Sequence, residues 1–128
     1  MKTIILTGLV TVMLAGNVFQ SSELERIGLA IQTGNSKELA KYFDTTVEIA
    51  ILDNEQSYSK AQAEMVLKDF FTKNKPASFK IMHNGASQGG LQYGIGTLVT
   101  SNLTYRTTIY LKQKGDTHYI QTLRFEND

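Results

Sequence analysis

The side chains of this sequence that could carry out acid–base or metal chemistry are few and scattered. His83 and His118 are the only two histidines, and there is no cysteine among the 128 residues. Without cysteine, the chain can form no disulfide, no thiolate metal site and no cysteine nucleophile. Two histidines far apart in the sequence do not supply the clustered ligands that zinc requires. We therefore expect neither a metal nor any other cofactor.

His83 is the candidate for proton transfer, because simple alternation along its strand places it on the same face as Phe79 and Ile81. A catalytic histidine needs a partner that orients its ring, and no neighbouring residue provides one. Since Asn84 and Gly85 follow directly, the alternative is a histidine at a strand end whose ring bonds the backbone. The aspartates fall in predicted turns, in or after helices, or at the chain end. The sequence therefore assigns no catalytic residue.

Composition excludes other classes of protein. The chain has 13 Lys and Arg against 12 Asp and Glu, a net charge of +1, and 41% hydrophobic residues. A nucleic-acid-binding domain would normally carry a basic excess, so we expect no nucleic-acid partner. The length and the apolar fraction predict one globular domain with one core.

The first 20 residues differ from the rest of the chain. Lys2 precedes an apolar run, Ile4–Ala15, which Gly16 and Asn17 end. This arrangement is typical of a secretory signal peptide, and the run is short for a transmembrane helix. The alternative is a buried first element of the domain. We predict a signal peptide over 1–20, a single domain over 21–128, export to the periplasm of a Gram-negative bacterium, and membrane contact only through an uncleaved signal segment.

Helix signals follow. Ser22-Glu23-Leu24-Glu25 fits a capping box that opens a helix, and Gly34 ends it. A short second helix is predicted from Ser36. Another capping box, Ser59-Lys60-Ala61-Gln62, opens a third helix that must stop before Pro76.

Strand signals occupy the rest of the chain. Val47–Ile51 alternates apolar and polar residues, and 57–58 can form a short returning strand. After Pro76, four alternating stretches are separated by short polar turns, which predicts an antiparallel meander. The fold class is therefore α+β, with three N-terminal helices packed on a strongly curved, mostly antiparallel sheet.

Several segments resemble one family of small exported bacterial proteins, typical of Bacteroidetes and known as domain of unknown function 4783. They are Phe70–Pro76, His83–Gly85, Tyr105–Lys112 and Ile120–Arg124. The order of elements is similar to the cone of the nuclear-transport-factor-2-like (NTF2-like) superfamily, also called cystatin-like. The resemblance implies this cone and export, but no activity. Enzymes of that superfamily carry an Asp or an Asp–His pair inside the cone, and no carboxylate alternates inward here.

In such a cone, alternation sorts the strand residues between a concave face toward the helices and an outer face. On the fourth stretch it predicts that Tyr93, Ile95, Thr97 and Val99 face inward. The candidate ligand-binding residues inside the cone are Tyr42, His83, Tyr93, Tyr105, Tyr119 and Gln121. The alternative for the tyrosines is ordinary aromatic packing in the core.

The outer face carries a mixture of apolar and cationic side chains. The candidate interface residues on it are Met82, Leu98, Arg106, Tyr110, His118, Ile120 and Arg124. Such a face is either a solvated sheet surface or a surface that pairs with a second copy.

Two functions fit these observations. The first is a non-enzymatic exported binding or protein-interaction module whose partner is itself, another envelope protein or a small molecule, and which dimerises through its sheet. The alternative is a small-molecule-binding or small-molecule-converting enzyme of the cone fold that uses His83 and the pocket tyrosines.

Overall fold

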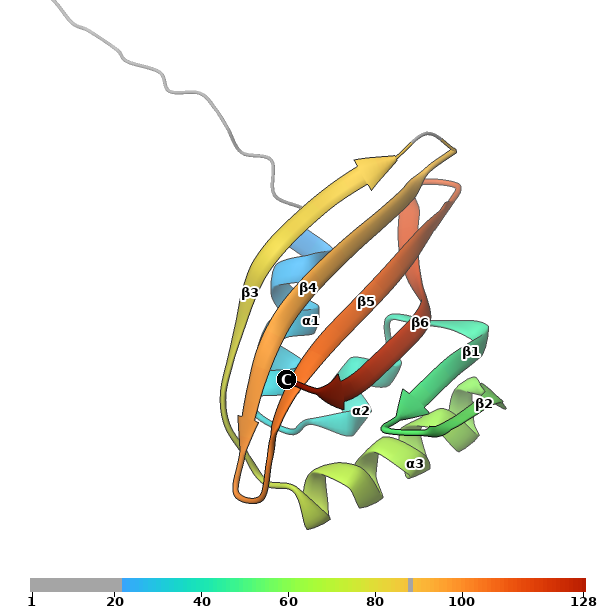
Figure 1. Ribbon diagram of the computed structural model, residues 1–128. Helices are drawn as coiled ribbons and strands as arrows, with labels where there is room; N and C mark the ends of the chain where they lie inside the picture. Colours follow the sequence, from blue (N-terminus) through green and yellow to red (C-terminus); the bar gives the residue numbers. More distant parts are fainter. Residues whose placement is uncertain (1–21, 88) are drawn as a thin grey trace, which may run out of the picture.

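The computed structural model describes residues 22–87 and 89–128, in which helices and a six-stranded sheet form two layers (Figure 1). The helices are α1 (Ser22–Gln32), α2 (Ser36–Ala40) and α3 (Lys60–Lys73). The strands are β1 (Phe43–Ile51), β2 (Asn54–Ser59), β3 (Pro76–Ser87), β4 (Leu91–Thr100), β5 (Thr104–Lys114) and β6 (Thr117–Asn127). The signal peptide predicted over 1–20 and the Ser22 side chain of the first capping box lie outside the described part.

Local signals set the helix ends as predicted. Gly34 has a φ of +65° and ends α1, with the amide of Asn35 bonded to the carbonyl of Ala30 at 2.8 Å. Glycine adopts this left-handed conformation without the steric cost of a side chain. At the start of α3, both bonds of the capping box between Ser59 and Gln62 are present, each at 3.2 Å. The second capping box is thus confirmed.

The sheet has the order β2-β1-β6-β5-β4-β3. β1 and β6 are parallel, and the other neighbouring strands are antiparallel, as the predicted fold class requires. Figure 1 shows the long strands β3 to β6 curving in front of α1 and α2, with α3 below them. The predicted α+β cone is therefore confirmed.

The strand pairing is irregular at four places, one of which is Ala77 near the start of β3. The register also shifts at Met82 in β3 and at Gln121 in β6, where β6 pairs with β5. Between Phe43 and Glu48, β1 separates from β6, so that four β1 residues stand opposite Gln121 alone. A bulge leaves a residue unpaired and reverses the expected alternation beyond it. These shifts therefore determine which side chains face the interior of the cone.

The core fills the space between the helices and the concave face of the sheet. Its aromatic base is Phe70, Phe71, Tyr105 and Phe125, with the rings of Phe70 and Phe125 4.5 Å apart. Leu24, Ile27 and Ile31 of α1 are buried, and α1 packs on β3 and on β4, where Leu24 lies beside Gly94. Fully burying a side chain of this kind contributes about 1.5–3 kcal/mol, so this contact holds α1 on the sheet.

Candidate functional site

Of the six predicted pocket residues, Tyr105 belongs to the core and Tyr42 is partly buried against it. Tyr42 packs against it from the turn before β1. Tyr105 meets Phe70 edge-on, with ring centroids 5.3 Å apart, and its hydroxyl donates a hydrogen bond of 3.1 Å to Oδ1 of Asn74. Burial raises the pKa of Tyr105, so its hydroxyl remains a protonated donor inside the fold.

Strand β4 faces the opposite way from the prediction. Its residues that face outward instead of inward are Tyr93, Ile95, Thr97 and Val99. Gly94, Gly96 and Leu98 are buried toward the helices. A Cβ on Gly94 would lie 3.0 Å from the Leu24 side chain, and one on Gly96 would lie 2.9 Å from the Phe79 ring. Glycines face inward because α1 and Phe79 occupy this space, and Leu98, predicted for the interface, belongs to the core.

The bulge at Gln121 likewise reverses the predicted faces at the start of β6. Ile120, predicted on the outer face, is fully buried. His118, also predicted on the outer face, lies against α1, with Nδ1 3.8 Å from a carboxylate oxygen of Glu23. Tyr119 and Gln121, predicted inside the cone, are half-buried on either side of Ile120. The histidine that approaches a carboxylate is therefore His118.

His83 lies on the outer face of the sheet. The bulge at Met82 places His83 opposite Ile95, and residues opposite each other on neighbouring strands share a face. Its side chain is exposed. The predicted inward position of His83 is therefore wrong, and His83 does not meet Tyr105 inside the cone.

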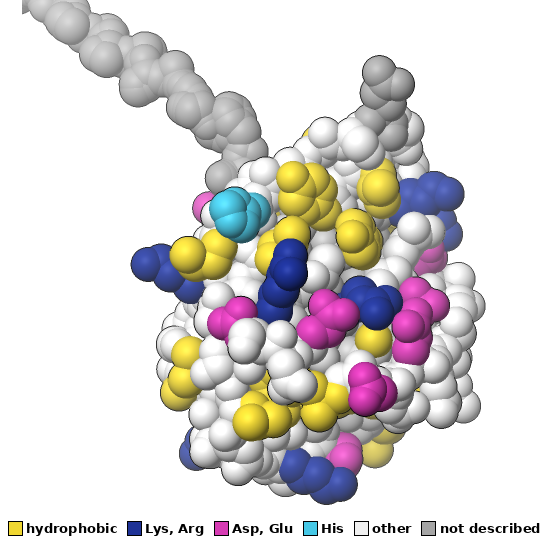
Figure 2. Space-filling model, viewed as in Figure 1, with side chains coloured by type: hydrophobic (Ala, Val, Ile, Leu, Met, Phe, Trp, Pro, Cys, Tyr) yellow, Lys and Arg dark blue, Asp and Glu magenta, His cyan; other side chains and the backbone are white. Residues whose placement is uncertain are grey.

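An apolar patch, which we call the open sheet face, lies on the side of the sheet turned away from α1 and α2. It consists of Met82, His83, Tyr93, Ile95, Val99 and Tyr110. Met82 is 56% exposed and Tyr110 is 37% exposed. Figure 2 shows hydrophobic side chains on the upper half of this face, a band of charged side chains below them, and further hydrophobic side chains beneath that band. Of the predicted interface residues, Met82 and Tyr110 belong to this patch, and Arg106 and Arg124 lie on the same side of the sheet.

The lower edge of the open sheet face carries a cluster of charges. The guanidinium of Arg124 lies 3.3 Å from the carboxylate of Glu55 and 3.7 Å from that of Glu126. A hydrogen bond with Glu55, together with burial and the charge of that carboxylate, raises the pKa of Glu48, and Arg124 partly opposes this. Arg124 thus holds acidic side chains of neighbouring strands close together.

A cavity of about 400 Å³ opens where β1 separates from β6, and it is lined by Phe43, Asp44, Thr45, Lys60, Lys114 and Tyr119. Asp44 is a carboxylate whose side chain is only 10% exposed, and Lys114 donates a 2.8 Å hydrogen bond to its Oδ1. The backbone amide of Thr45 donates to the same oxygen at 2.7 Å. Lys114, with the help of Thr45, lowers the pKa of Asp44 despite burial, so this carboxylate is ionised. Because Asp44 and Lys114 are 70 positions apart, no motif in the sequence indicates that they meet.

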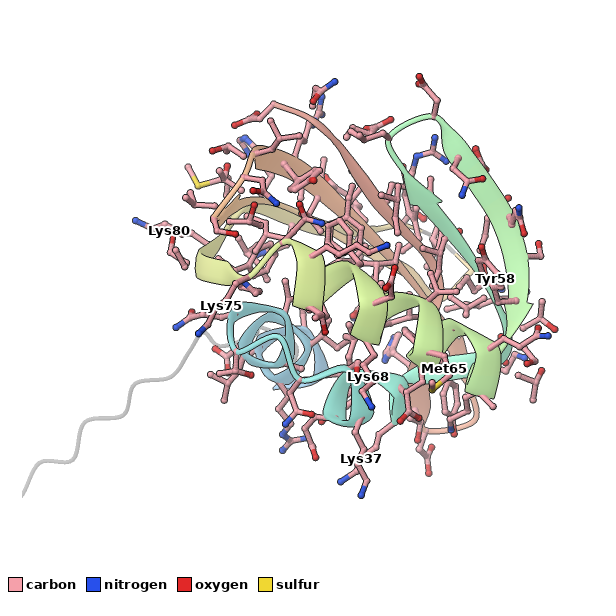
Figure 3. All side chains as sticks on the ribbon, turned by 90° about the horizontal axis from the view of Figure 1, so that it is seen from below. Lys37, Tyr58, Met65, Lys68, Lys75 and Lys80 are labelled. Carbon is pink, nitrogen blue, oxygen red and sulfur yellow. The ribbon has the colours of Figure 1, made fainter. Side chains whose placement is uncertain are left out.

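A larger cavity of about 690 Å³ lies between the α1–α2 turn, α3 and the start of β3. Lys37, Lys68 and Lys75 line it together with Phe71 and Pro76, and we call it the lysine groove. In Figure 3, Lys37 and Lys68 extend from α2 and α3, while Lys75 lies further along, beyond the end of α3. The sequence contains no motif that predicts this groove, because its three lysines come from three separate segments.

Within residues 22–87 and 89–128, no group of three or more His, Asp or Glu side chains is arranged to hold a metal ion. In the same ranges, no helix combines the length and the apolar character needed to cross a membrane.

Comparison with solved structures identifies the fold and close relatives. A DUF4783 protein from Bacteroides uniformis is 28% identical, with a TM-score of 0.77 over 81% of this chain and 95% of that chain. One from Bacteroides ovatus is 29% identical, with a TM-score of 0.77 over 80% and 93%. An NTF2-like protein of unknown function from Cytophaga hutchinsonii shares 11% identity and the same fold, with a TM-score of 0.59 over 82% and 86%.

No curated protein matches the chain. The family model described as domain of unknown function (DUF4783) matches residues 24–126. This match spans α1 to β6, the elements that build the cone, the open sheet face and both cavities. The chain therefore belongs to the DUF4783 family, on an NTF2-like fold.

Proposed function

We propose that this protein is an exported, non-enzymatic interaction module whose open sheet face pairs with a second copy of the chain. The observation that carries the proposal is the apolar patch on a sheet face that none of the described helices covers. Contiguous exposed apolar surface on a folded domain marks an interaction site. A two-fold axis through the patch would cover the same residues on both copies, as in most homodimers.

The charges around the patch support self-pairing. Arg106 lies opposite Glu126 on the next strand and takes part in no ion pair among the described residues. The carboxylate of Glu126 lies 3.7 Å from the guanidinium of Arg124, beyond hydrogen-bond distance. In a two-fold arrangement, the free guanidinium of Arg106 in one copy would face carboxylates of the other. A polar rim of this kind gives an interface its register more than its affinity.

The interior of the cone supports a non-enzymatic role. Phe70, Phe71 and Leu123, which would obstruct a cavity, are all buried in the core. His83, the histidine proposed for catalysis, lies on the outer face instead. His83 and Tyr105, which the enzyme hypothesis places together inside the cone, therefore do not share a cavity.

A small-molecule function is supported at a different place. The 400 Å³ cavity beside Asp44 has the size and the mixture of polar and apolar walls that small ligands use. Its Asp44, Lys114 and Tyr119 replace His83 as the residues on which this alternative rests. Native mass spectrometry of the purified protein tests both functions, because a retained ligand and a dimer give different masses.

Export rests on the apolar segment Ile4–Ala15. Expression of the full chain in a Gram-negative host, followed by fractionation and mass measurement, tests it. We expect a periplasmic protein shortened by about 20 residues, the length of the predicted signal. A protein of full mass in the cytoplasm would contradict export without affecting the pairing proposal.

The pairing proposal is tested by Met82→Glu, which places a charge on the part of the patch that the edge strand β3 contributes. Leu29→Glu is the matched control, because Leu29 is 60% exposed on α1, away from this face. Light scattering should show a dimer for the parent protein and for Leu29→Glu, and a monomer for Met82→Glu. A parent protein that is monomeric at about 100 μM, well above the Kd of a stable homodimer, overturns the proposal.

A further inference from the structure

We propose that the lysine groove binds an acidic peptide segment of a partner protein. The first argument is charge. Lys37, Lys68, Lys75 and Glu64 all line the groove and give it a net charge of +2, whereas the whole chain carries only +1. None of these three lysines forms an ion pair with another described residue, although three lysines elsewhere do. The groove thus holds positive charge that the fold itself leaves uncompensated.

The second argument is that the groove is already ordered. The carbonyl of Lys75 accepts a 2.9 Å bond from the amide of Ser101, and Asn102 donates a 2.7 Å bond to the carbonyl of Lys73. These bonds tie the end of α3 to the β4–β5 turn. At the other wall, Gly34 approaches Pro76 so closely that a Cβ would lie 3.2 Å from its ring. Because the backbone is fixed before binding, a ligand would not have to order it.

The third argument concerns the shape of the ligand. The lysines extend along the groove from α2, α3 and the segment before β3, so they do not converge on one point (Figure 3). A single small anion could reach only part of this set. Between them, Phe71 and Pro76 provide apolar surface. An extended peptide directs successive side chains to opposite sides, so its carboxylates can meet the lysines while an apolar side chain packs on Phe71 and Pro76.

The inference is independent of pairing through the open sheet face, because the groove and that face share no residue. The probe is a fluorescein-labelled peptide, Asp-Glu-Leu-Asp-Glu-Phe, titrated with the protein purified after expression of the full chain. Its neutral counterpart, Asn-Gln-Leu-Asn-Gln-Phe, serves as the comparison. Fluorescence anisotropy should show saturable binding of the acidic peptide at least about tenfold tighter than that of the neutral one, and weaker binding at high salt because exposed charges are screened.

Variants locate the site. Lys37→Glu with Lys68→Glu should weaken binding of the acidic peptide by at least about tenfold, since two attractive contacts become repulsive. The control is Lys112→Glu with Lys80→Glu, which makes the same change of charge on exposed strand residues outside the groove. Circular dichroism checks that both double variants are folded.

Three results would overturn the inference. The first is the absence of saturable binding of the acidic peptide. The second is equal weakening by both double variants, which would indicate attraction to the net charge of the protein. The third is equally strong binding of inorganic polyphosphate at the same groove, which would indicate a site for polyanions in general. A monomer in light scattering, by contrast, would contradict pairing and leave this inference standing.

Discussion

Lys114 at the end of β5 donates a 2.8 Å hydrogen bond to Oδ1 of Asp44 at the start of β1, across 70 positions of sequence. Between these two strands in the sheet lies β6, from which β1 separates just after Phe43. The pair therefore spans the opening in the sheet. Because the Asp44 side chain is nearly buried and the Lys114 side chain is half exposed, the bond is only partly screened by water.

Replacing Asp44 by Asn should destabilise the protein in a way that depends on pH. Lys114 lowers the pKa of Asp44 in the folded protein below the ordinary 3.8. The ionised Asp44 therefore stabilises the fold fully above pH 3.8, and this stabilisation is lost as the pH falls through the folded-state pKa of Asp44. We expect Asp44→Asn to lower the free energy of unfolding by about 1–2 kcal/mol at pH 7. Urea unfolding should show this difference shrinking below about pH 4. A difference that is constant down to pH 2 would contradict the assigned ion pair.

Arg124 should stabilise the charged edge of the open sheet face at neutral pH. In Arg124→Gln, the carboxylates of Glu48 and Glu55 lose the cation that offsets their repulsion. The folded-state pKa of Glu48 already lies above the ordinary 4.5 and should rise further. An acidic group whose pKa is raised in the folded protein stabilises the fold fully at pH values below its unfolded-state pKa. This stabilisation is lost as the pH rises through its folded-state pKa.

The variant Arg124→Gln should therefore be less stable than the parent by about 1 kcal/mol at pH 7, and this difference should shrink at about pH 4, below the ordinary pKa of Glu48. The control is Arg106→Gln, because Arg106 lies on the same face without an ion pair among the described residues. Thermal unfolding at both pH values measures the effect. Equal pH dependence in the two variants would contradict the role given to Arg124.

Gly96 should be the least replaceable glycine of β4. A Cβ on Gly96 would lie 2.5 Å from the backbone carbonyl oxygen of Lys80, so Gly96→Ala must push β3 and β4 apart. We expect a loss of about 1–3 kcal/mol in chemical denaturation. Gly28→Ala is the matched control, because its Cβ would make ordinary contacts of 3.5 Å or more. In a helix, this change should be neutral or stabilising by up to about 1 kcal/mol. Equal tolerance of both changes would contradict the close approach of the two strands.

Local patterns in the sequence determined the elements and their order. The capping box at Ser59, the glycine that ends α1 and the proline after α3 act over a few residues. Each signal is therefore complete within its own segment, and short turns then require consecutive strands to pair. This is why the α+β class, the curved sheet and the position of every described helix follow from the sequence.

The tertiary structure alone decided which side chains face the helices. Bulky residues such as Tyr93 and Ile95 are usually buried, but β4 turns Gly94 and Gly96 inward because Leu24 and Phe79 fill that space. The glycines at alternate positions were the signal of a close approach, although the identity of the approaching residues depends on distant segments.

Bulges had the same effect on the candidate site. One unpaired residue at Gln121 turns His118 and Ile120 toward the helices, and one at Met82 turns His83 outward. Where a bulge occurs depends on how two strands fit against the rest of the sheet, and no alternation pattern records it. The contact between Asp44 and Lys114 and the meeting of three lysines in one groove likewise require the chain to fold first, because their residues come from segments that approach each other only in the tertiary structure.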